Sequence, residues 1–282
     1  MVCLPDFEIM ILGLPNRFQR SCRLGLDLDR RLVERTSAIS KKVVGVGVWF
    51  MMRALVTGSA QGIGRAIADT LVSRGYGVVG ADVQFQEGTE FEVLALDVSD
   101  SEACRQAVAE LGHFDVLVNN AGVLVEKSPE SISDEEFDLT MAINLRAPFV
   151  LSVAVSDGMK ERGWGRIVNI SSVGARTGGI SQSSVYAASK AGLLALTKNF
   201  ARNLGPFGIT TNAVLPGAIA SPMATKQFEK DEALKRQVVA ANPTGRLGSP
   251  EEVASVVAFL VSDEAAYLNG GCIDVNGGWV MT

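Results

Sequence analysis

The 282-residue sequence predicts an α/β fold in which one parallel sheet carries helices on both faces. Short β-branched apolar runs alternate with stretches of helical periodicity from Arg53 onward. Hydrophobic residues make up 47% of the chain and charged residues 20%, which is enough apolar material for a buried core. No internal repeat or low-complexity linker interrupts the alternation, so 52–282 is expected to form a single domain.

Short apolar runs are expected to form about seven buried strands. Most are rich in β-branched residues and end in Gly, Asn, Asp or Ser, as buried parallel strands do. The segment 84–92 between the second and third runs is too short for a full crossover helix. The runs are Ala54–Val56, Val78–Ala81, Val93–Leu96, Val116–Val118, Ile167–Ile170, Ile209–Leu215 and Ile273–Val275.

Helices are indicated between these strands by apolar residues at every third or fourth position. The first helix stops near Gly75, Ser133-Asp-Glu-Glu136 is a capping box, and Pro250 marks a helix start. The apolar stripes are Ile63, Ile67 and Leu71; Phe137, Met141, Leu145 and Phe149; Leu193, Leu196, Phe200 and Leu204; and Val253, Val256, Val257 and Leu260.

Charge and cysteine content exclude several classes of function. A net charge of -5 argues against a nucleic-acid-binding protein, which usually has a basic face. One histidine and four scattered cysteines, without a Cys-x-x-Cys pair, make neither a common zinc site nor a disulfide framework. We therefore expect no metal and a reducing, cytoplasmic setting. The longest apolar run in the first 52 residues, Val43–Met52, is shorter than the roughly 20 residues of a membrane-spanning helix.

Residues 1–51 differ from the rest of the chain and are expected to be a leader of doubtful structural role. They lack the strand–helix alternation, and no small-residue cleavage site of a secretory signal follows the apolar run. Several arginines leave a mitochondrial-type transit peptide open, although Asp27, Asp29 and Glu34 count against it. The favoured interpretation is that Met51 or Met52 is the natural start and that the leader is an upstream translation or was added for expression.

A glycine-rich turn follows the first strand and leads directly into a helix: Thr57-Gly58-Ser-Ala-Gln-Gly62-Ile-Gly64. Such a turn presents free backbone N–H groups and the positive end of the helix dipole, and its glycines let a pyrophosphate approach. Asp82, at the end of the second strand, is placed to accept hydrogen bonds from an adenosine ribose. Together these features predict a Rossmann-type, doubly wound dinucleotide-binding domain. Its first candidate binding residues are Gly58, Ser59, Gln61, Gly62, Ile63, Gly64 and Asp82.

The expected cofactor is NAD rather than NADP. Neither Gln61 in the loop nor Val83 and Gln84 after Asp82 supplies a cation for a 2′-phosphate.

Tyr186-Ala-Ala-Ser-Lys190 is a candidate for acid/base chemistry, and Ser172 precedes it at the end of the fifth strand. Residues at i and i+4 share one helical face, so the phenol and the ammonium group can approach each other. A nearby cation is expected to lower the tyrosine pKa from about 10 and thereby make a general acid/base. A Ser–His–Asp hydrolase is disfavoured, because His113 is the only histidine and there is no Gly-x-Ser-x-Gly elbow.

In these motifs the chain resembles the short-chain dehydrogenase/reductases, in their shorter single-domain branch. The resemblance covers essentially all of 52–282. Thr57–Gly64 matches the family's Thr-Gly-x-x-x-Gly-x-Gly loop, and Asn119-Asn120-Ala121-Gly122 matches its signature after strand four. Asp97-Val98 matches the pair that contacts adenine, and Pro216-Gly217 matches the turn after strand six. The resemblance adds the cofactor-binding candidates Asp97, Val98, Asn120, Ala121, Gly122, Tyr186, Lys190, Pro216, Gly217, Ile219 and Ser221.

The resemblance also implies a role for each catalytic candidate. Tyr186 is the acid/base and Ser172, rather than Ser171, holds the substrate oxygen. Lys190 binds the nicotinamide ribose and tunes the tyrosine, while Asn144 supports a water-mediated proton relay. Ile219 offers its backbone to the carboxamide, and Ser221 stands where the family usually has threonine.

The implied activity is hydride transfer between nicotinamide and a secondary alcohol or ketone in an NAD-dependent homotetramer. Two substrate classes stay open: 3-oxoacyl thioesters, as in a 3-oxoacyl-[acyl-carrier-protein] reductase using NADPH, and polyols or sugar acids. A non-catalytic nucleotide-sensing regulator is a remote alternative, because such proteins typically lose the Tyr/Lys pair.

Overall fold

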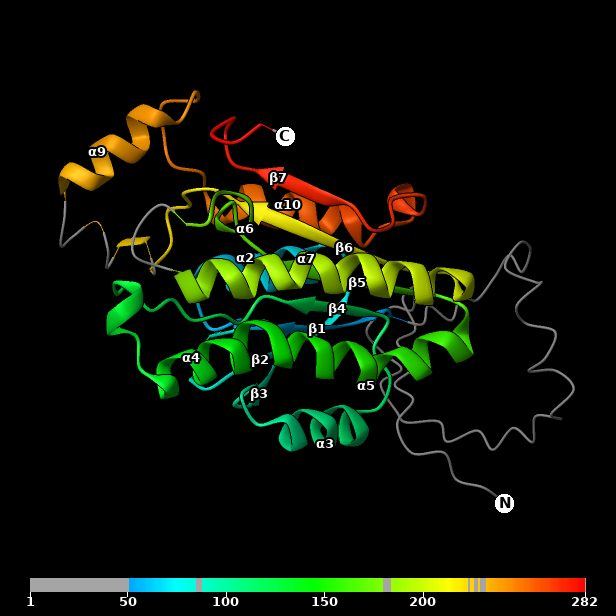
Figure 1. The fold of residues 1–282 in the computed structure, drawn as a ribbon. Helices are drawn as coiled ribbons and strands as arrows, with labels where there is room; N and C mark the ends of the chain where they lie inside the picture. The colour runs from blue at the N-terminus through cyan, green and yellow to red at the C-terminus, as the bar shows by residue number, and fades with distance from the viewer. Residues whose placement is uncertain are drawn as a thin grey trace, which may run out of the picture. The chain divides into compact units, whose positions relative to one another are not determined.

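The expected strands assemble into a seven-stranded sheet, with the order β3-β2-β1-β4-β5-β6-β7 and every neighbouring pair parallel (Figure 1). The computed structural model describes residues 51–84, 88–179, 184–222, 224–225, 228 and 232–281. The strands are β1 Arg53–Thr57, β2 Gly77–Asp82, β3 Glu92–Ala95, β4 Val116–Asn119, β5 Gly165–Ile170, β6 Ile209–Pro216 and β7 Cys272–Val275.

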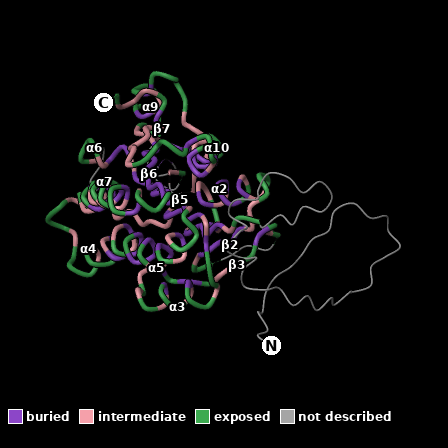
Figure 2. The backbone as a smooth tube through the Cα atoms, turned by 90° about the vertical axis from the view of Figure 1, so that its right-hand side faces the viewer, coloured by how far each residue is buried: buried purple, intermediate pink, exposed green. Residues whose placement is uncertain are grey.

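Helices cover both faces of this sheet, as predicted. The helices α2 and α10 pack on one face, and α3, α5 and α7 pack on the other (Figures 1 and 2). The helices are α2 Gly62–Ser73, α3 Ser101–Leu111, α4 Asp134–Met141, α5 Ala147–Arg162, α6 Gly174–Thr177, α7 Ser184–Leu204, α9 Glu232–Ala241 and α10 Pro250–Leu260. Short turns are η2 Pro129–Ser131, the π-helical η3 Ala142–Arg146, η4 Gly205–Phe207 and η5 Asp263–Ala265.

The sheet is buried on both faces because successive strand residues point to opposite sides. In β1, Ala54 and Val56 belong to the core under α2 and α10, whereas Leu55 belongs to the core under α3 and α5. All three are almost completely buried. Burial of one such leucine contributes about 1.5–3 kcal/mol, so two cores of this kind hold the helices on the sheet.

The strand order reverses at β1, which pairs with β2 on one side and β4 on the other. Beyond β2 the sheet continues to β3, and beyond β4 it continues to β5 in the opposite direction. A crevice forms outside the carboxyl ends of the strands at such a point. The connection from β2 to β3 contains no helix among its described residues 83–84 and 88–91, in line with its predicted shortness.

Both expected helix starts are observed with reciprocal caps. Ser133 and Glu136 form the capping box of α4, and Ser249 and Glu252 form a second one at α10. The stripe that begins at Phe137 does not lie against the sheet: Phe137 is 46% exposed and Phe149 is 47% exposed. In contrast, Val253, Val257 and Leu260 of α10 are buried as predicted.

One described helical stretch, Asp134–Arg162, is long and apolar enough to cross a membrane by length and composition. In this fold 56% of its most apolar window is buried, and α5 within it packs on β4 and β5. Packing on the sheet accounts for that apolar character.

Residues 1–50, the bulk of the predicted leader, lie outside the described residues. The doubtful structural role of the leader therefore stays a prediction, whereas Met52–Thr282 forms one compact unit, as expected.

Candidate active site

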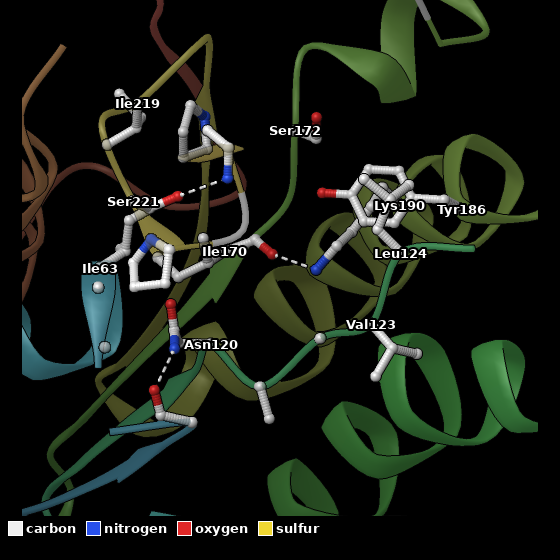
Figure 3. A pocket seen from close by; sticks show the side chains of 18 of the residues that line it. Ile63, Asn120, Val123, Leu124, Ile170, Ser172, Tyr186, Lys190, Ile219 and Ser221 are labelled. Atoms are coloured by element: carbon white, nitrogen blue, oxygen red, sulfur yellow. Dashed lines mark hydrogen bonds between the residues drawn. The ribbon is translucent and has the colours of Figure 1, made fainter. Parts of the chain in front are cut away.

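A cavity of about 430 Å³ lies at the carboxyl ends of the strands, where the strand order reverses. The loops after β1, β2, β4, β5 and β6 all contribute to its wall (Figure 3). Parallel strands bring these loops to one edge, so motifs spread along the whole sequence converge there.

The glycine loop requires glycine at its first and third glycine positions. Gly58 has a left-handed φ of +67°, and a Cβ added there would lie 2.8 Å from the Ala121 Cα. A Cβ on Gly64 would lie 2.0 Å from the Gly58 carbonyl oxygen. The start of α2 therefore packs directly on the end of β1, which leaves the helix N-terminus open to the cavity.

Thr57 and Asn120 brace this loop against the turn after β4. The Thr57 hydroxyl oxygen accepts hydrogen bonds from the backbone N–H groups of Asn120 and Ala121, both at 3.0 Å. The Asn120 side-chain amide donates to the carbonyl oxygens of Thr57 at 2.9 Å and Gly58 at 3.0 Å (Figure 3). Asn120 therefore lines the cavity while its amide is engaged by the loop.

Asp82 lies on the cavity wall at the end of β2, with its carboxylate fixed by backbone donors. Its Oδ2 accepts from the Ala60 N–H at 3.0 Å and its Oδ1 from the Val83 N–H at 2.7 Å. Asp97 and Val98, after β3, line the same end of the cavity. Among the described lining residues Lys190 is the only cation.

The other predicted cofactor-binding residues divide into two groups. Ser59 is fully buried, does not line the cavity, and its Oγ would lie 2.5 Å from a Cβ on Gly80, so its side chain faces β2. The rest line the cavity: Gln61, Gly62, Ile63, Ala121, Gly122, Pro216, Gly217, Ile219 and Ser221.

Ser172 and Tyr186 meet on the opposite wall of the cavity, and the phenol oxygen points into it (Figure 3). Burial raises the pKa of Tyr186 above its ordinary value of 10.0, and a side-chain hydrogen bond with Ser172 acts in the opposite direction. The sequence predicts that the nearby Lys190 lowers this pKa. In the structure the pKa is raised instead, because removal of the phenol from water outweighs the influences that lower it. Ser171 also lines the cavity, but its hydroxyl is engaged and donates to the Lys190 carbonyl oxygen at 2.9 Å.

Lys190 is a buried cation one helical turn from Tyr186. Its Nζ donates to the Ile170 carbonyl oxygen at 2.8 Å and lies 5.7 Å from the centre of the Tyr186 ring. Burial lowers the pKa of Lys190 to about 8, because the charged form loses hydration. The ammonium group is therefore held between the tyrosine and the end of β5.

Asn144 lies in the π-helical turn η3 and does not line the cavity. Its Oδ1 accepts from the Val123 N–H and its Nδ2 donates to the Val123 carbonyl oxygen, both at 2.9 Å. Nδ2 also donates to the Ser189 hydroxyl at 3.1 Å. A Cβ on Gly122 would lie 3.3 Å from Lys190 Nζ and 3.4 Å from Asn144 Oδ1, so Asn144 lies just behind the cavity wall and holds the segment after β4.

This arrangement fits a dinucleotide that spans the cavity. The open N-terminus of α2 suits a pyrophosphate, and Asp82 suits ribose hydroxyls. Lys190 and Tyr186 mark the reactive end. The left-handed Gly62, whose Cβ would lie 3.2 Å from Pro222 Cδ, keeps the gap between the two walls clear.

Comparison with known proteins agrees with the geometry. Residues 58–280 match the family model described as enoyl-(acyl carrier protein) reductase. The 3-oxoacyl-[acyl-carrier-protein] reductase FabG of Salmonella typhimurium is 40% identical over 240 residues, which are 81% of this chain and 97% of that protein. The chain belongs to the short-chain dehydrogenase/reductase family.

Solved structures of the family have the same fold. The aldohexose dehydrogenase of Thermoplasma acidophilum superposes with a TM-score of 0.76 at 32% identity, covering 82% of this chain and 97% of that one. YwfH, an NADPH-dependent reductase involved in bacilysin biosynthesis, has a TM-score of 0.76 at 28% identity and covers 83% and 100%. This short-chain dehydrogenase/reductase is thus an oxidoreductase that acts on an alcohol or ketone with a nicotinamide cofactor.

Several wall residues were missed by sequence reasoning, and for all of them except Trp279 no motif gives a signal. Leu124, Leu234, Val238 and Trp279 all line the cavity. For Trp279 a signal was present, since it follows two glycines, Gly277 at φ +65° and Gly278 at φ +84°, that turn the chain back.

The buried lysine predicts how ketone reduction depends on pH. The rate should hold through neutral pH, where Tyr186 is protonated, and should fall above about pH 8 as Lys190 loses its proton. Lys190→Arg should be less active than the unmodified enzyme. Because arginine stays charged over this pH range, the rate of the variant should show no inflection near pH 8. Measurement of kcat/KM from pH 6 to 10 for both proteins checks this, and superimposable profiles would show that another group controls the fall.

Proposed function

We propose that this chain reduces the ketone of a 3-oxoacyl thioester with NADH. The observation that carries the proposal is the convergence of the Ser172 and Tyr186 hydroxyls on one point of a cavity whose wall also contains a set of apolar side chains outside the cofactor motifs. Two hydroxyls at one point suit a single carbonyl or carbinol oxygen.

The substrate side favours an acyl chain over a sugar acid. Five apolar residues on the described cavity wall lie outside the cofactor motifs: Leu124, Phe228, Leu234, Val238 and Trp279. A sugar acid would leave its hydroxyls facing these apolar side chains without partners, which costs free energy. The named activity of the Salmonella relative, on 3-oxoacyl-[acyl-carrier-protein], supports the same substrate class. The aldohexose dehydrogenase has the same fold at lower identity, so sugars serve as the comparison in the test.

In the proposed mechanism each side chain acts on the substrate oxygen or on Tyr186. When bound, the nicotinamide supplies the hydride to the carbonyl carbon in reduction and accepts it in oxidation. Tyr186 transfers its proton to the carbonyl oxygen, while Ser172 donates a hydrogen bond to that oxygen. The charge of Lys190 stabilises the phenolate that remains. Asn144 holds the Val123 backbone, and we keep its part in proton resupply as a proposal.

The choice of NAD over NADP rests on the charges at the adenosine end. Asp82 and Asp97 put two carboxylates there, and among the described lining residues no cation accompanies them. Arg65, in the first turn of α2, is already paired with Asp69 at 2.8 Å. YwfH is NADPH-dependent, so membership of the family does not imply NAD, and the proposal of NAD depends on the local charges alone.

We also propose a cytoplasmic homotetramer. The described cysteines, Cys104 and Cys272, are free thiols, as in a reducing compartment. The exposed apolar side chains of α4 and α5 suit a subunit interface; these are Phe137, Leu139, Phe149 and Val153.

A substrate panel tests the proposal. NADH oxidation at 340 nm should be fastest with acetoacetyl-CoA and longer 3-oxoacyl thioesters, and slower by at least about a hundredfold in kcat/KM with keto sugars and keto acids. Trp279→Ala, which removes a large side chain from the wall and so enlarges the cavity, should shift the preference toward longer acyl chains. Equal or better turnover of keto sugars would contradict the substrate class, although the oxidoreductase assignment would stand.

A further inference from the structure

The Ser172 hydroxyl has a second partner that determines what it can donate. Its Oγ accepts a hydrogen bond from the Gly174 N–H at 3.0 Å. With a lone pair engaged, the hydroxyl hydrogen is left to point toward Tyr186 or a substrate oxygen. Gly174 is the first residue of α6, and a Cβ there would lie 3.3 Å from Ser172 Oγ and 3.8 Å from the Tyr186 ring. The position of α6 therefore controls the direction of this hydrogen bond.

The helix α6 is only four residues long and buries little of its own surface. Val173, just before it, is tied to β6 through the Pro216 carbonyl oxygen at 3.1 Å. The other end of α6 needs a different anchor, because a single helical turn of this length is not stable alone.

Arg176 supplies that anchor. Its Nε donates to Asp274 Oδ1 at 3.2 Å and its Nη2 to Asp274 Oδ2 at 3.1 Å, so the pair is bidentate. Nη2 also donates to the Cys272 carbonyl oxygen at 3.1 Å. The side chains are 25% and 23% exposed, which limits screening by solvent. One guanidinium thus joins α6 to the edge strand β7.

We propose that Arg176 is a positioning residue for catalysis. It does not line the cavity; it holds α6 on β7 so that the Gly174 N–H orients the Ser172 hydroxyl. The inference rests on the proposed function only in that Ser172 acts on the substrate oxygen.

Arg176→Ala should lower kcat for ketone reduction by about tenfold, since small misplacements of a catalytic group cost this much or more. KM for NADH should stay unchanged, because the glycine loop lies on the other wall. Asp274→Ala should lower kcat by a similar factor. The double variant Arg176→Ala/Asp274→Ala should lose no more kcat than either single variant, because both substitutions break the same ion pair. Arg176→Lys, a charge without the bidentate fork, should recover only part of the loss.

The matched control is Arg162, which also joins two elements, but at the amino end of the sheet. Its Nε lies 3.1 Å from Asp115 Oδ1, with side chains 32% and 13% exposed. Arg162→Ala should lower the melting temperature at least as much as Arg176→Ala does and leave kcat near the unmodified value.

Epistasis with Ser172 decides between positioning and general destabilisation. In a Ser172→Ala background, Arg176→Ala should have no further effect on kcat, because its target is gone. A further tenfold loss there, or an equal kcat loss in Arg162→Ala, overturns the proposal. The comparison uses whichever ketone the enzyme reduces, so failure of the thioester proposal in the panel is distinguishable from failure of this one.

Discussion

Tyr186→Phe is expected to lower kcat for ketone reduction by roughly 10²–10⁴-fold, the usual contribution of a general acid/base. The phenol oxygen points into the cavity beside Ser172 (Figure 3). Because burial raises the pKa of Tyr186, the side chain holds its proton at neutral pH and is ready to donate it. Phenylalanine keeps the ring and removes the hydroxyl group that carries this proton.

Stopped-flow turnover and NADH titration of the purified variant check both halves of this expectation. NADH should bind with nearly unchanged affinity, since the glycine loop and Asp82 are intact. Tyr267, unlike the buried Tyr186, is fully exposed to solvent. Tyr267→Phe is therefore the matched control and should keep full activity. Retention of most activity by Tyr186→Phe would remove the tyrosine from the mechanism.

The second large effect concerns the cofactor: NAD should be preferred over NADP by at least tenfold in kcat/KM. The Asp82 carboxylate is held by the Ala60 and Val83 N–H groups, so it cannot turn away freely from a 2′-phosphate. At about 4 Å and an effective dielectric near 20, two unit charges repel by up to roughly 4 kcal/mol. Solvent reduces this value, but each 1.4 kcal/mol that remains is about tenfold.

Three variants separate charge from shape. Asp82→Asn keeps the size of the side chain and an acceptor oxygen but removes the charge. If charge is the cause, Asp82→Asn should reduce the preference for NAD over NADP about as much as Asp82→Ala does. Val83 is exposed and lines the cavity, so Val83→Arg should add a phosphate partner and begin to reverse the preference. The measurement is kcat/KM with NADH and NADPH for each protein. Equal use of both cofactors by the unmodified enzyme would show that this interpretation of Asp82 is wrong.

The strands and most helices could be predicted because their signals are local. β-branched runs, the capping box at Ser133 and the stripe from Val253 each act within a few residues. The stripe from Phe137 shows the limit: its spacing predicted a helix correctly, but which side chains become buried depends on elements elsewhere in the chain, and Phe137 and Phe149 are exposed.

Site residues were predictable where a motif requires a backbone shape, as in the glycine loop. A motif does not reveal the direction of each side chain. Ser59 belongs to the loop and was predicted to bind the cofactor, but its side chain faces β2 rather than the cavity. It also misjudged the pKa of Tyr186, because spacing on a helix reveals the neighbouring cation but not the loss of water.

The sequence by itself therefore determined the fold class, the glycine loop and the Tyr186/Lys190 pair, since periodicity, turn conformation and i, i+4 spacing are properties of nearby residues. Only the tertiary structure decided how far the site is buried, which walls are apolar, and that Arg176 reaches Asp274. Those features arise from contacts between segments far apart in the chain, whose distances and solvent exposure exist only after the sheet has formed.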